Sequence, residues 1–524
     1  MKNLILIISF IIIPSAGIRA QFTWLDHTFH SNGMLQIQHD TSSLVSSVVL
    51  QPDSKILALC NYSNGDVFIS SDSVVIYRIN PDGTPDLSFG HAGSVSLALS
   101  VGGSGANMIL QPDNKILITV GFTNAMYDDI LVRLNPDGSF DNSFGTNGVT
   151  SEGSQTVTSS GAILLHNSTY LLNVIDAGGP GASSRFTWFD ASGNIISDSY
   201  ITPYDTICDG FLIRDMIEQP DSTILAAGAV WTVNLTCQYS GLARFKKNGQ
   251  IDSTFATKGI AYLSSRPIIH SSAYLANQAN SIAIQSDGKI LIAGGLTIGH
   301  QSDSLFVARY THNGLIDTSF GGHGITTIPL PNVESGVNKI VLQTDGKIIL
   351  VGRIDSINYE RVVLARLNTD GTLDTSFGSA GTLMVELNDG GQYSTMAIQS
   401  DGKIVVAGFE GGRSSNPHII IARYLPSHNV GVLNFTRDNN NIFIYPNPVR
   451  RIETLEYTLQ ENEVITIELQ DISGKDIFTY INGESQPTGV HTQNIILSDD
   501  LPSGAYIIAI SSPKGKVGIK VIKE

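Results

Sequence analysis

The chain is 524 residues long and carries a net charge of −16, with 15% charged and 42% hydrophobic residues. This length exceeds what one small core needs and allows two or three domains. The low charged fraction, together with 51 glycines, favours a β-rich extracellular protein over a helical cytosolic one. The acidic balance argues against nucleic acid as a partner, because binding phosphates needs a concentrated basic patch.

Residues 1–20 have the three parts of a secretory signal peptide. Lys2 supplies a basic start, Leu4 to Pro14 form an apolar run, and small residues lead up to Ala20. The run falls short of the roughly 20 residues that a spanning helix needs, and no later stretch is apolar enough to span a bilayer. We therefore predict export, removal of residues 1–20, and no transmembrane segment in the mature chain.

A short motif that we call the head recurs along the chain. It begins at Gln51 as QPDSKIL. Clear copies follow at Gln111, Gln219, Gln285, Gln343 and Gln399. A worn copy from Leu165 to Leu171 lies midway in the longest gap between heads, which makes seven heads in all.

A second motif, the tail, follows the heads and reads Arg-Leu-Asn-Pro-Asp-Gly and then Asp-x-Ser-Phe-Gly, with a worn copy at 188–200. The seventh head ends at Arg423 to Pro426 without a tail, whereas residues 25–33 form a tail, LDHTFHSNG, that no head precedes. A chain that begins with one half of a unit and ends with the other half predicts a closed ring, because the first strand can complete the last unit.

Each unit contains four short β candidates. In the fifth unit they are residues 280–285, 289–294, 305–310 and 325–330. Ser286-Asp287-Gly288 joins the first two as a tight hairpin. Four strands in each unit of about 54 to 66 residues predict a seven-bladed β-propeller over residues 21–426. An array of separate two-sheet domains is the alternative, but it leaves the split repeat unexplained.

Within the tail, an arginine and an aspartate stand eight residues apart in five units. These pairs are Arg78/Asp86, Arg133/Asp141, Arg244/Asp252, Arg309/Asp317 and Arg366/Asp374. The worn tail has Trp188 and Ile196 at the two positions, so both partners are lost together. We predict a bidentate Arg–carboxylate bridge in each intact unit. The closing unit must then pair Arg423 with Asp26.

The repeats resemble the delta-60 repeat family, whose pattern is a QPDGKI-type head followed by RLNPDG and LDTSFG. The resemblance covers residues 25–426. It implies a propeller-like fold in a large secreted bacterial protein, and it implies no common ligand or activity.

A polar linker at 427–440 precedes a second distinctive region at 441–524. Alternating runs such as Val464 to Leu469 and Ala505 to Ser511, separated by Gly and Pro turns, predict a small Ig-like β-sandwich. The region resembles the type A sorting domain of the type IX secretion system. The motif residues that carry the resemblance are Pro446, Asn447, Pro448, Gly474, Gly504, Tyr506 and Lys520.

This second resemblance implies recognition by the outer-membrane translocon after Sec export to the periplasm. It also implies proteolytic removal of the domain or attachment to surface lipopolysaccharide. The protein would then be released or held at the outer-membrane surface. The alternative is an ordinary adhesive sandwich domain at the terminus.

The sequence contains no catalytic or cofactor signature. HExxH, GxSxG and P-loop patterns are absent, and the histidines show no ligand-like spacing, so we predict no metal and no cofactor. Of the three cysteines, Cys208 and Cys237 lie in the same irregular part of the chain and could pair, whereas Cys60 falls on a predicted inner strand as a buried thiol.

Residues that break the repeat are the candidates for binding, because functional loops often sit on a rigid scaffold. The irregular connections lie around the third to fifth blades. The candidate ligand-face residues are Trp231, Tyr262, Arg266, His270 and Tyr274. Exposed aromatic rings at these positions could stack on sugars or anchor a peptide. A merely decorated loop is the competing interpretation.

Three functions remain open. The first is a non-catalytic surface or extracellular propeller that binds glycan or protein. The second is a propeller enzyme acting on polysaccharide, since such enzymes assemble their sites from distant loops. The third is a structural spacer at the cell surface. The irregular loops favour the first.

Overall fold

The chain forms two compact units, Met1–His428 and Asn429–Glu524. The computed structural model describes residues 24–523 except 31–32, 39–41, 64–72, 98–103, 122–128, 152–157, 177–182, 202–207, 233–237, 264–277, 298–301, 332–333, 356–359, 388–389, 412–416, 427–441, 446, 450, 460, 472–475, 499 and 513–514. The described part contains no helix that is long and apolar enough to cross a membrane.

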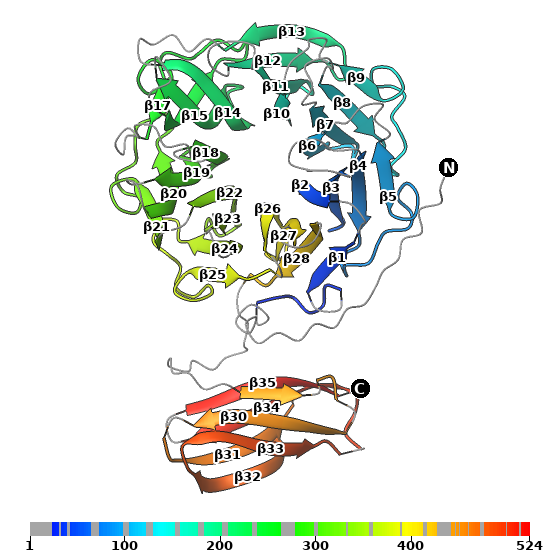
Figure 1. Ribbon diagram of the computed structural model, residues 1–524, viewed down its shortest axis with the longest axis vertical. Helices are drawn as coiled ribbons and strands as arrows, with labels where there is room; N and C mark the ends of the chain where they lie inside the picture. The colour runs from blue at the N-terminus through cyan, green and yellow to red at the C-terminus, as the bar shows by residue number, and fades with distance from the viewer. Residues whose placement is uncertain are drawn as a thin grey trace. The chain divides into compact units, whose positions relative to one another are not determined.

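The described strands of the first unit form seven four-stranded antiparallel sheets, which we call blades one to seven (Figure 1). Blades one to three are β2 (Ser42–Leu50), β3 (Ile56–Ser63), β4 (Ser73–Ile79) and β5 (Ser94–Leu97); β6 (Ser104–Leu110), β7 (Ile116–Gly121), β8 (Ile130–Leu134) and β9 (Val149–Ser151); and β10 (Thr158–Leu164), β11 (Tyr170–Asp176), β12 (Ser183–Phe189) and β13 (Ile195–Tyr200).

Blades four to seven continue around the ring in chain order. They are β14 (Cys208–Glu218), β15 (Ile224–Thr232), β16 (Gln238–Phe245) and β17 (Ile260–Tyr262); β18 (Gln278–Ile284), β19 (Ile290–Thr297), β20 (Ser302–Tyr310) and β21 (Ile325–Pro331); β22 (Glu334–Leu342), β23 (Ile348–Asp355), β24 (Glu360–Leu367) and β25 (Thr382–Val385); and β26 (Gly391–Ile398), β27 (Ile404–Glu410), β28 (His418–Tyr424) and β1 (Met34–Ile37).

Blade seven joins the two ends of the first unit. Its outermost strand, β1, comes from the N-terminal half-repeat and pairs antiparallel with β28, with Met34 opposite Ala422. The preceding residues continue the pairing, because the Asp26 amide donates to the Arg423 carbonyl at 2.8 Å and the Arg423 amide donates to the Gly33 carbonyl at 3.0 Å. Figure 1 shows the blue β1 beside the yellow β28.

The apolar cores lie between adjacent blades. One core packs Leu59 and Ile76 of blade one against Met108 and Ile118 of blade two. Another joins the two ends of the unit, since it includes Ile56 of blade one and Ile421 of blade seven together with other fully buried strand residues. Burial between blades therefore holds the ring together around its whole circumference.

Every innermost strand carries a β-bulge at the same position, five residues before the first residue of the head. The bulged residues are Ser46, Ala106, Ser160, Arg214, Asn280, Asn338 and Ser394. In blade four, Ile213 pairs with Gly228 and Asp215 with Ala227, which leaves Arg214 as the extra residue. A bulge redirects the side chains beside it, so this position sets what the inner strands present at the ring axis.

Antiparallel pairing gives the ring two distinct faces. The head turns, such as Gln51–Lys55, and the tail turns that join the third strand to the fourth lie at one end of every blade, which we call the turn face. The strand ends that do not flank these turns therefore lie at the opposite end of each blade, which we call the loop face.

The second unit contains two sheets around a core of its own. One has the order β29 (Ile442–Tyr445), β30 (Ile452–Leu459) and β33 (Gly489–Ile496), and the other has β32 (Asp476–Gln486), β31 (Glu463–Gln470), β34 (Gly504–Ser512) and β35 (Gly515–Lys523). Leu455, Ile467 and Ile508 from the two sheets are fully buried in this core.

Candidate functional site

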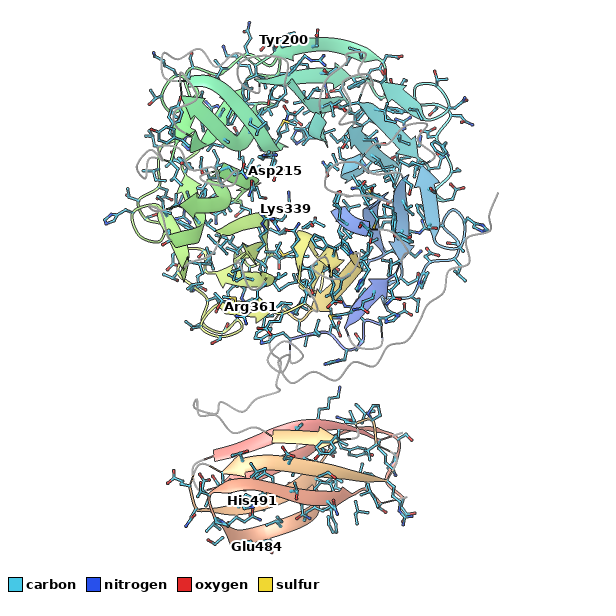
Figure 2. All side chains as sticks on the ribbon, in the orientation of Figure 1. Tyr200, Asp215, Lys339, Arg361, Glu484 and His491 are labelled. Carbon is cyan, nitrogen blue, oxygen red and sulfur yellow. The ribbon has the colours of Figure 1, made fainter. Side chains whose placement is uncertain are left out.

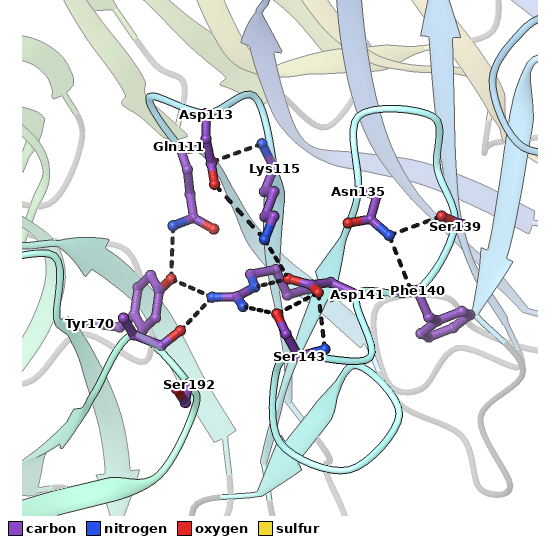
Figure 3. A network of polar contacts seen from close by, with 12 residues as sticks. Gln111, Asp113, Lys115, Asn135, Ser139, Phe140, Asp141, Ser143, Tyr170 and Ser192 are labelled. Atoms are coloured by element: carbon purple, nitrogen blue, oxygen red, sulfur yellow. Dashed lines mark hydrogen bonds and ion pairs between the residues drawn. The ribbon is translucent and has the colours of Figure 1, made fainter.

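The arginine and aspartate of each tail form a contact on the turn face. In blade two, the Arg133 Nε donates to Asp141 Oδ2 at 2.7 Å, and Lys115 of the head reaches the same oxygen at 3.0 Å (Figure 3). The Arg133 guanidinium also donates to the Ser143 hydroxyl at 3.1 Å and to the Tyr170 hydroxyl at 3.1 Å. Both charged side chains of the pair are buried.

The contact differs from the bidentate bridge that the sequence predicts. The second carboxylate oxygen of Asp141 accepts from the Ser143 amide at 3.0 Å and from the Ser143 hydroxyl at 2.7 Å. Because this oxygen is engaged by the Asp-x-Ser turn, the guanidinium divides its donors between Asp141 Oδ2 and the serine hydroxyl. The expectation of a two-oxygen fork was therefore wrong.

The same geometry recurs at the other five pairs. The Nε to Oδ2 distances are 2.7 Å for Arg78/Asp86, 2.8 Å for Arg244/Asp252, 2.8 Å for Arg309/Asp317, 2.7 Å for Arg366/Asp374 and 2.8 Å for Arg423/Asp26. Each guanidinium also lies over the phenylalanine ring of its own tail, at 4.5 to 4.8 Å from the ring centroid.

Each arginine also links its blade to the next one. The Arg309 Nη1 donates to the Thr369 carbonyl of blade six at 2.6 Å, and Arg244 donates to the His312 carbonyl of blade five at 3.1 Å. In blade seven, where β1 and β28 close the ring at what we call the seam, Arg423 donates to the Pro81 carbonyl of blade one. The Arg–Asp pairs therefore hold neighbouring blades together, and their repetition around the ring assigns them to the scaffold. We call each pair, together with the phenylalanine ring under its guanidinium, a clasp.

Blade three replaces the whole clasp with one tryptophan. Trp188 pairs with Leu171, and this is the position at which Arg133 pairs with Leu117 in blade two. A Cβ added to Gly249, in the tail turn of blade four, would lie 2.5 Å from the Trp188 ring. The indole thus fills the space that the Arg–Phe stack occupies in the other blades.

The clasp carboxylates are held ionised by their neighbours. Burial by itself would raise the pKa of Asp86, but hydrogen bonds from Ser88 and Lys55 and the charge of Arg78 outweigh it and hold the pKa well below its usual range. The pKa is lowered in the same way at Asp26, Asp141, Asp252, Asp317 and Asp374.

These shifts predict a steep loss of stability in acid. A carboxylate whose pKa is lower in the folded chain stabilises the fold above its unfolded pKa of about 3.9, and this contribution is lost as the pH falls toward the folded value. Urea unfolding between pH 7 and pH 2 should therefore show little change down to about pH 5 and a steep fall below about pH 4. The Asp141→Asn variant should show a shallower fall, and an unchanged slope would contradict the assignment.

Two of the five candidate binding residues, Tyr262 and Trp231, lie at the loop-face end of blade four. Tyr262 ends β17 and pairs with Gly241, and its ring meets the Tyr239 ring edge-on with centroids 6.3 Å apart. Both tyrosines are half-buried. The Trp231 backbone pairs with Gln238 and Gly210 at the same end of the blade, although its side chain lies outside the described residues.

The other three candidates, Arg266, His270 and Tyr274, fall within 264–277 and lie outside the described residues. The structure therefore brings together Tyr262 and the backbone of Trp231, and it adds Tyr239, which sequence reasoning missed. Its signal was its place near the start of the strand that follows residues 233–237, where the sequence departs from the repeat.

The cysteines are described only in part. Cys60 is a fully buried free thiol, and burial raises its pKa. It lies on β3, which stands between β2 and β4 in blade one, as expected for a buried thiol on an inner strand. Cys237 and the Cys208 side chain lie outside the described residues, so their pairing stays a prediction.

The part of the chain that the structure describes contains no cluster of three or more His, Cys, Asp or Glu that could hold a metal. It does contain a groove of about 630 Å³ on the turn face between blades five and six, lined by Lys289, Asp345 and Asp370 among others. The clasp residue Arg309 also borders this groove, so it is formed by the repeated scaffold.

In the second unit, Asn447 fastens the start of the domain to its last strand. The Asn447 side chain donates to the Lys520 carbonyl at 2.8 Å and accepts from the Ile522 amide at 2.8 Å. The Tyr506 hydroxyl donates to the Pro502 carbonyl at 2.7 Å, closing the turn before β34, which begins at Gly504. Pro446 and Gly474 lie outside the described residues, and Pro448 follows Asn447 directly.

The ring of repeated blades and the small two-sheet domain define a repeat-built, all-β propeller protein with a C-terminal appendage. Two protein families match the sequence. A β-propeller domain of unknown function, DUF5122, matches residues 51–89, 111–144, 219–255, 285–320, 343–377 and 399–427. A secretion system C-terminal sorting domain matches residues 443–524.

The chain therefore carries DUF5122 β-propeller repeats followed by a type IX secretion sorting domain, and both resemblances are confirmed. The sorting domain shows that the protein is exported and is secreted or attached at the cell surface, and it implies handling by the type IX secretion machinery. A comparison with curated proteins finds no match.

Solved structures of propellers are similar only distantly. The polysaccharide lyase Uly1 is 10% identical, with a TM-score of 0.42, over 73% of this chain and 90% of that chain. The β-propeller domain of the Trilobed protease from Pyrococcus furiosus, described as having an open velcro topology, is 9% identical with a TM-score of 0.38, over 74% and 94%.

Proposed function

We propose that the protein is a non-catalytic extracellular binding protein whose propeller holds a glycan or protein ligand on the loop face of blade four. The observation that carries this proposal is the gathering of aromatic residues there. Tyr239 and Tyr262 are in ring contact and half-buried, and the Trp231 backbone lies on the adjoining strand. Tyrosine and tryptophan offer a large apolar surface with a polar edge, which suits both sugars and peptides.

The distribution of the repeat supports the choice of face. The turn face is built from the same clasp in six blades, so its polar groups are engaged in holding neighbouring blades together. The loop-face ends differ from blade to blade, and a ligand site that occurs once in the ring needs residues that occur once.

A binding screen of the full-length protein against glycan arrays and cell-surface extracts tests the proposal. We expect a saturable ligand whose affinity falls about tenfold or more in Tyr262→Ala and Trp231→Ala, because loss of an aromatic anchor costs about 1 to 2 kcal/mol or more. Phe140→Ala is the matched control, since Phe140 is an exposed ring on the turn face of blade two. Turnover of a bound glycan would instead establish an enzyme, and absence of any ligand would favour a spacer.

A further inference from the structure

The innermost strands differ sharply in charge. Those of blades one, two, three, five and seven contain no charged residue. All the charged residues of the seven strands belong to blades four and six and are Asp209, Arg214, Asp215, Glu218, Glu334 and Lys339. A structural requirement shared by all blades would place charged residues in every innermost strand. It therefore does not explain charges that are confined to blades four and six.

One carboxylate in this group ties three blades together. Asp215 of blade four accepts from Lys339 Nζ of blade six at 2.9 Å, and it reaches over blade five, where the Ser281 hydroxyl and the Ile282 amide each donate to it at 3.1 Å. Asp215, Ser281 and Lys339 follow the bulge at equivalent positions in the three blades. Figure 2 shows Asp215 and Lys339 at the inner margin of the ring.

Arg214, beside this carboxylate, has no comparable partner. Its guanidinium contacts Gln278 Oε1 at 3.5 Å, the limit of a hydrogen bond, and the described residues offer it no carboxylate. The side chain is exposed, yet the surrounding protein desolvates it and lowers the pKa of the guanidinium. A guanidinium that is open to solvent and has no carboxylate partner is available to bind an anion.

The fold itself does not require an arginine at this position. Asn280 and Asn338 occupy the equivalent bulge position in blades five and six, where each amide donates to a backbone carbonyl of the next blade, Val337 at 2.9 Å and Tyr393 at 2.8 Å. A neutral asparagine therefore suffices to join neighbouring inner strands. The guanidinium of Arg214 adds a positive charge that these contacts do not use.

We propose that Arg214 and Lys339 form an anion site at the ring axis that takes the carboxylate of a monoanionic ligand. Arg214 presents a planar fork that matches a carboxylate, and Lys339, whose side chain is 37% exposed, adds a second positive charge. Arg214, Lys339 and Asp215 together carry one net positive charge, which one carboxylate neutralises. A dianion such as sulfate would be repelled by Asp215 and by a protein of net charge −16.

A cavity of about 510 Å³ begins one residue beyond Asp215 on β14 and provides room for the apolar part of the ligand. Inner strands of blades one to four line it, with Met216, Ile217 and Glu218 from β14, whereas Arg214, Asp215 and Lys339 do not border it. The site is separate from the loop-face aromatic residues, so it does not depend on the function proposed above.

The test is a titration of the full-length protein at constant ionic strength with sodium acetate, D-glucuronate, N-acetyl-L-alanine and sulfate. Calorimetry and the shift in melting temperature give the affinities. We expect saturable, millimolar binding of the carboxylates and at least about tenfold weaker binding of sulfate. Tighter binding of glucuronate would identify a sugar acid as the natural source, and tighter binding of N-acetyl-L-alanine would identify a peptide.

Arg214→Asn is the decisive variant because it installs the side chain that blades five and six already have at this position. It should keep the melting temperature without ligand and lose carboxylate affinity about tenfold or more. Lys247→Gln removes an exposed positive charge on the turn face of blade four and should leave the affinity unchanged. Equal binding of sulfate, no saturation with any carboxylate, or unchanged affinity in Arg214→Asn would overturn the proposal.

Discussion

Replacing Asp26 by alanine should destabilise the propeller by about 3 to 5 kcal/mol, because it leaves the buried Arg423 guanidinium without its carboxylate. Asp26 also accepts from the Thr28 hydroxyl at 2.7 Å and so fixes the N-terminal turn. Thermal and urea unfolding of the full-length protein measure the loss.

The matched control is Asp86→Ala in blade one, which removes the same contacts from a stretch where the chain is continuous. Both variants should lose stability, but only Asp26→Ala should speed amide hydrogen exchange in β1 and β28 at low temperature. An unchanged melting temperature with unchanged exchange in β1 would show that the seam does not depend on this pair.

Replacing Trp188 by alanine should cost a similar amount, about 3 to 5 kcal/mol, because it empties a large buried volume. The indole is 6% exposed and packs against Phe186, with ring centroids 5.8 Å apart, and against the Gly249 turn of blade four. Blade three has no arginine at this position whose contacts could compensate. Urea unfolding of the variant gives the free-energy change.

Trp188→Phe should recover part of the loss, since a smaller ring still reaches the core. Trp188→Arg should not, although it restores the residue type of the other blades, because Ile196 stands where they have the partner aspartate. If arginine proved as stable as tryptophan, the indole would not be replacing the clasp.

Much of the fold followed from the repeat. The position of the tail at 25–33 without a head already implied that β1 would join the last blade, and β1 pairs with β28. Such reasoning works because the head and tail encode tight turns, whose sequences are local and specific. It does not show how a side chain divides its hydrogen bonds. Asp141 illustrates this, because the serine two residues later engages the oxygen that the arginine was expected to share.

The axial cluster could not be found in the same way. Asp215 and Lys339 meet because a bulge redirects β14 and because blades four and six flank blade five, over which Asp215 reaches. Neither condition is visible in one repeat. The uneven charge of the inner strands was visible in the sequence, but it became meaningful only once those strands were known to be innermost. The loop-face candidates were found because they depart from the repeat. Tyr239 was missed because it is the second residue of β16 and so belongs to the repeated part of the blade.

The seam has a consequence for the order in which the protein is made. Asp26 and Arg423 are 397 residues apart, so the first part of the propeller to be synthesised cannot form its contacts until nearly the last part has been made. Until blade seven is complete, a nascent chain has apolar surfaces of blades one and six uncovered and leaves β1 unpaired. The propeller can therefore close only once β28 has been made, when the second unit at Asn429–Glu524 still follows, and a chain that ended before blade seven would leave β1 without its partner.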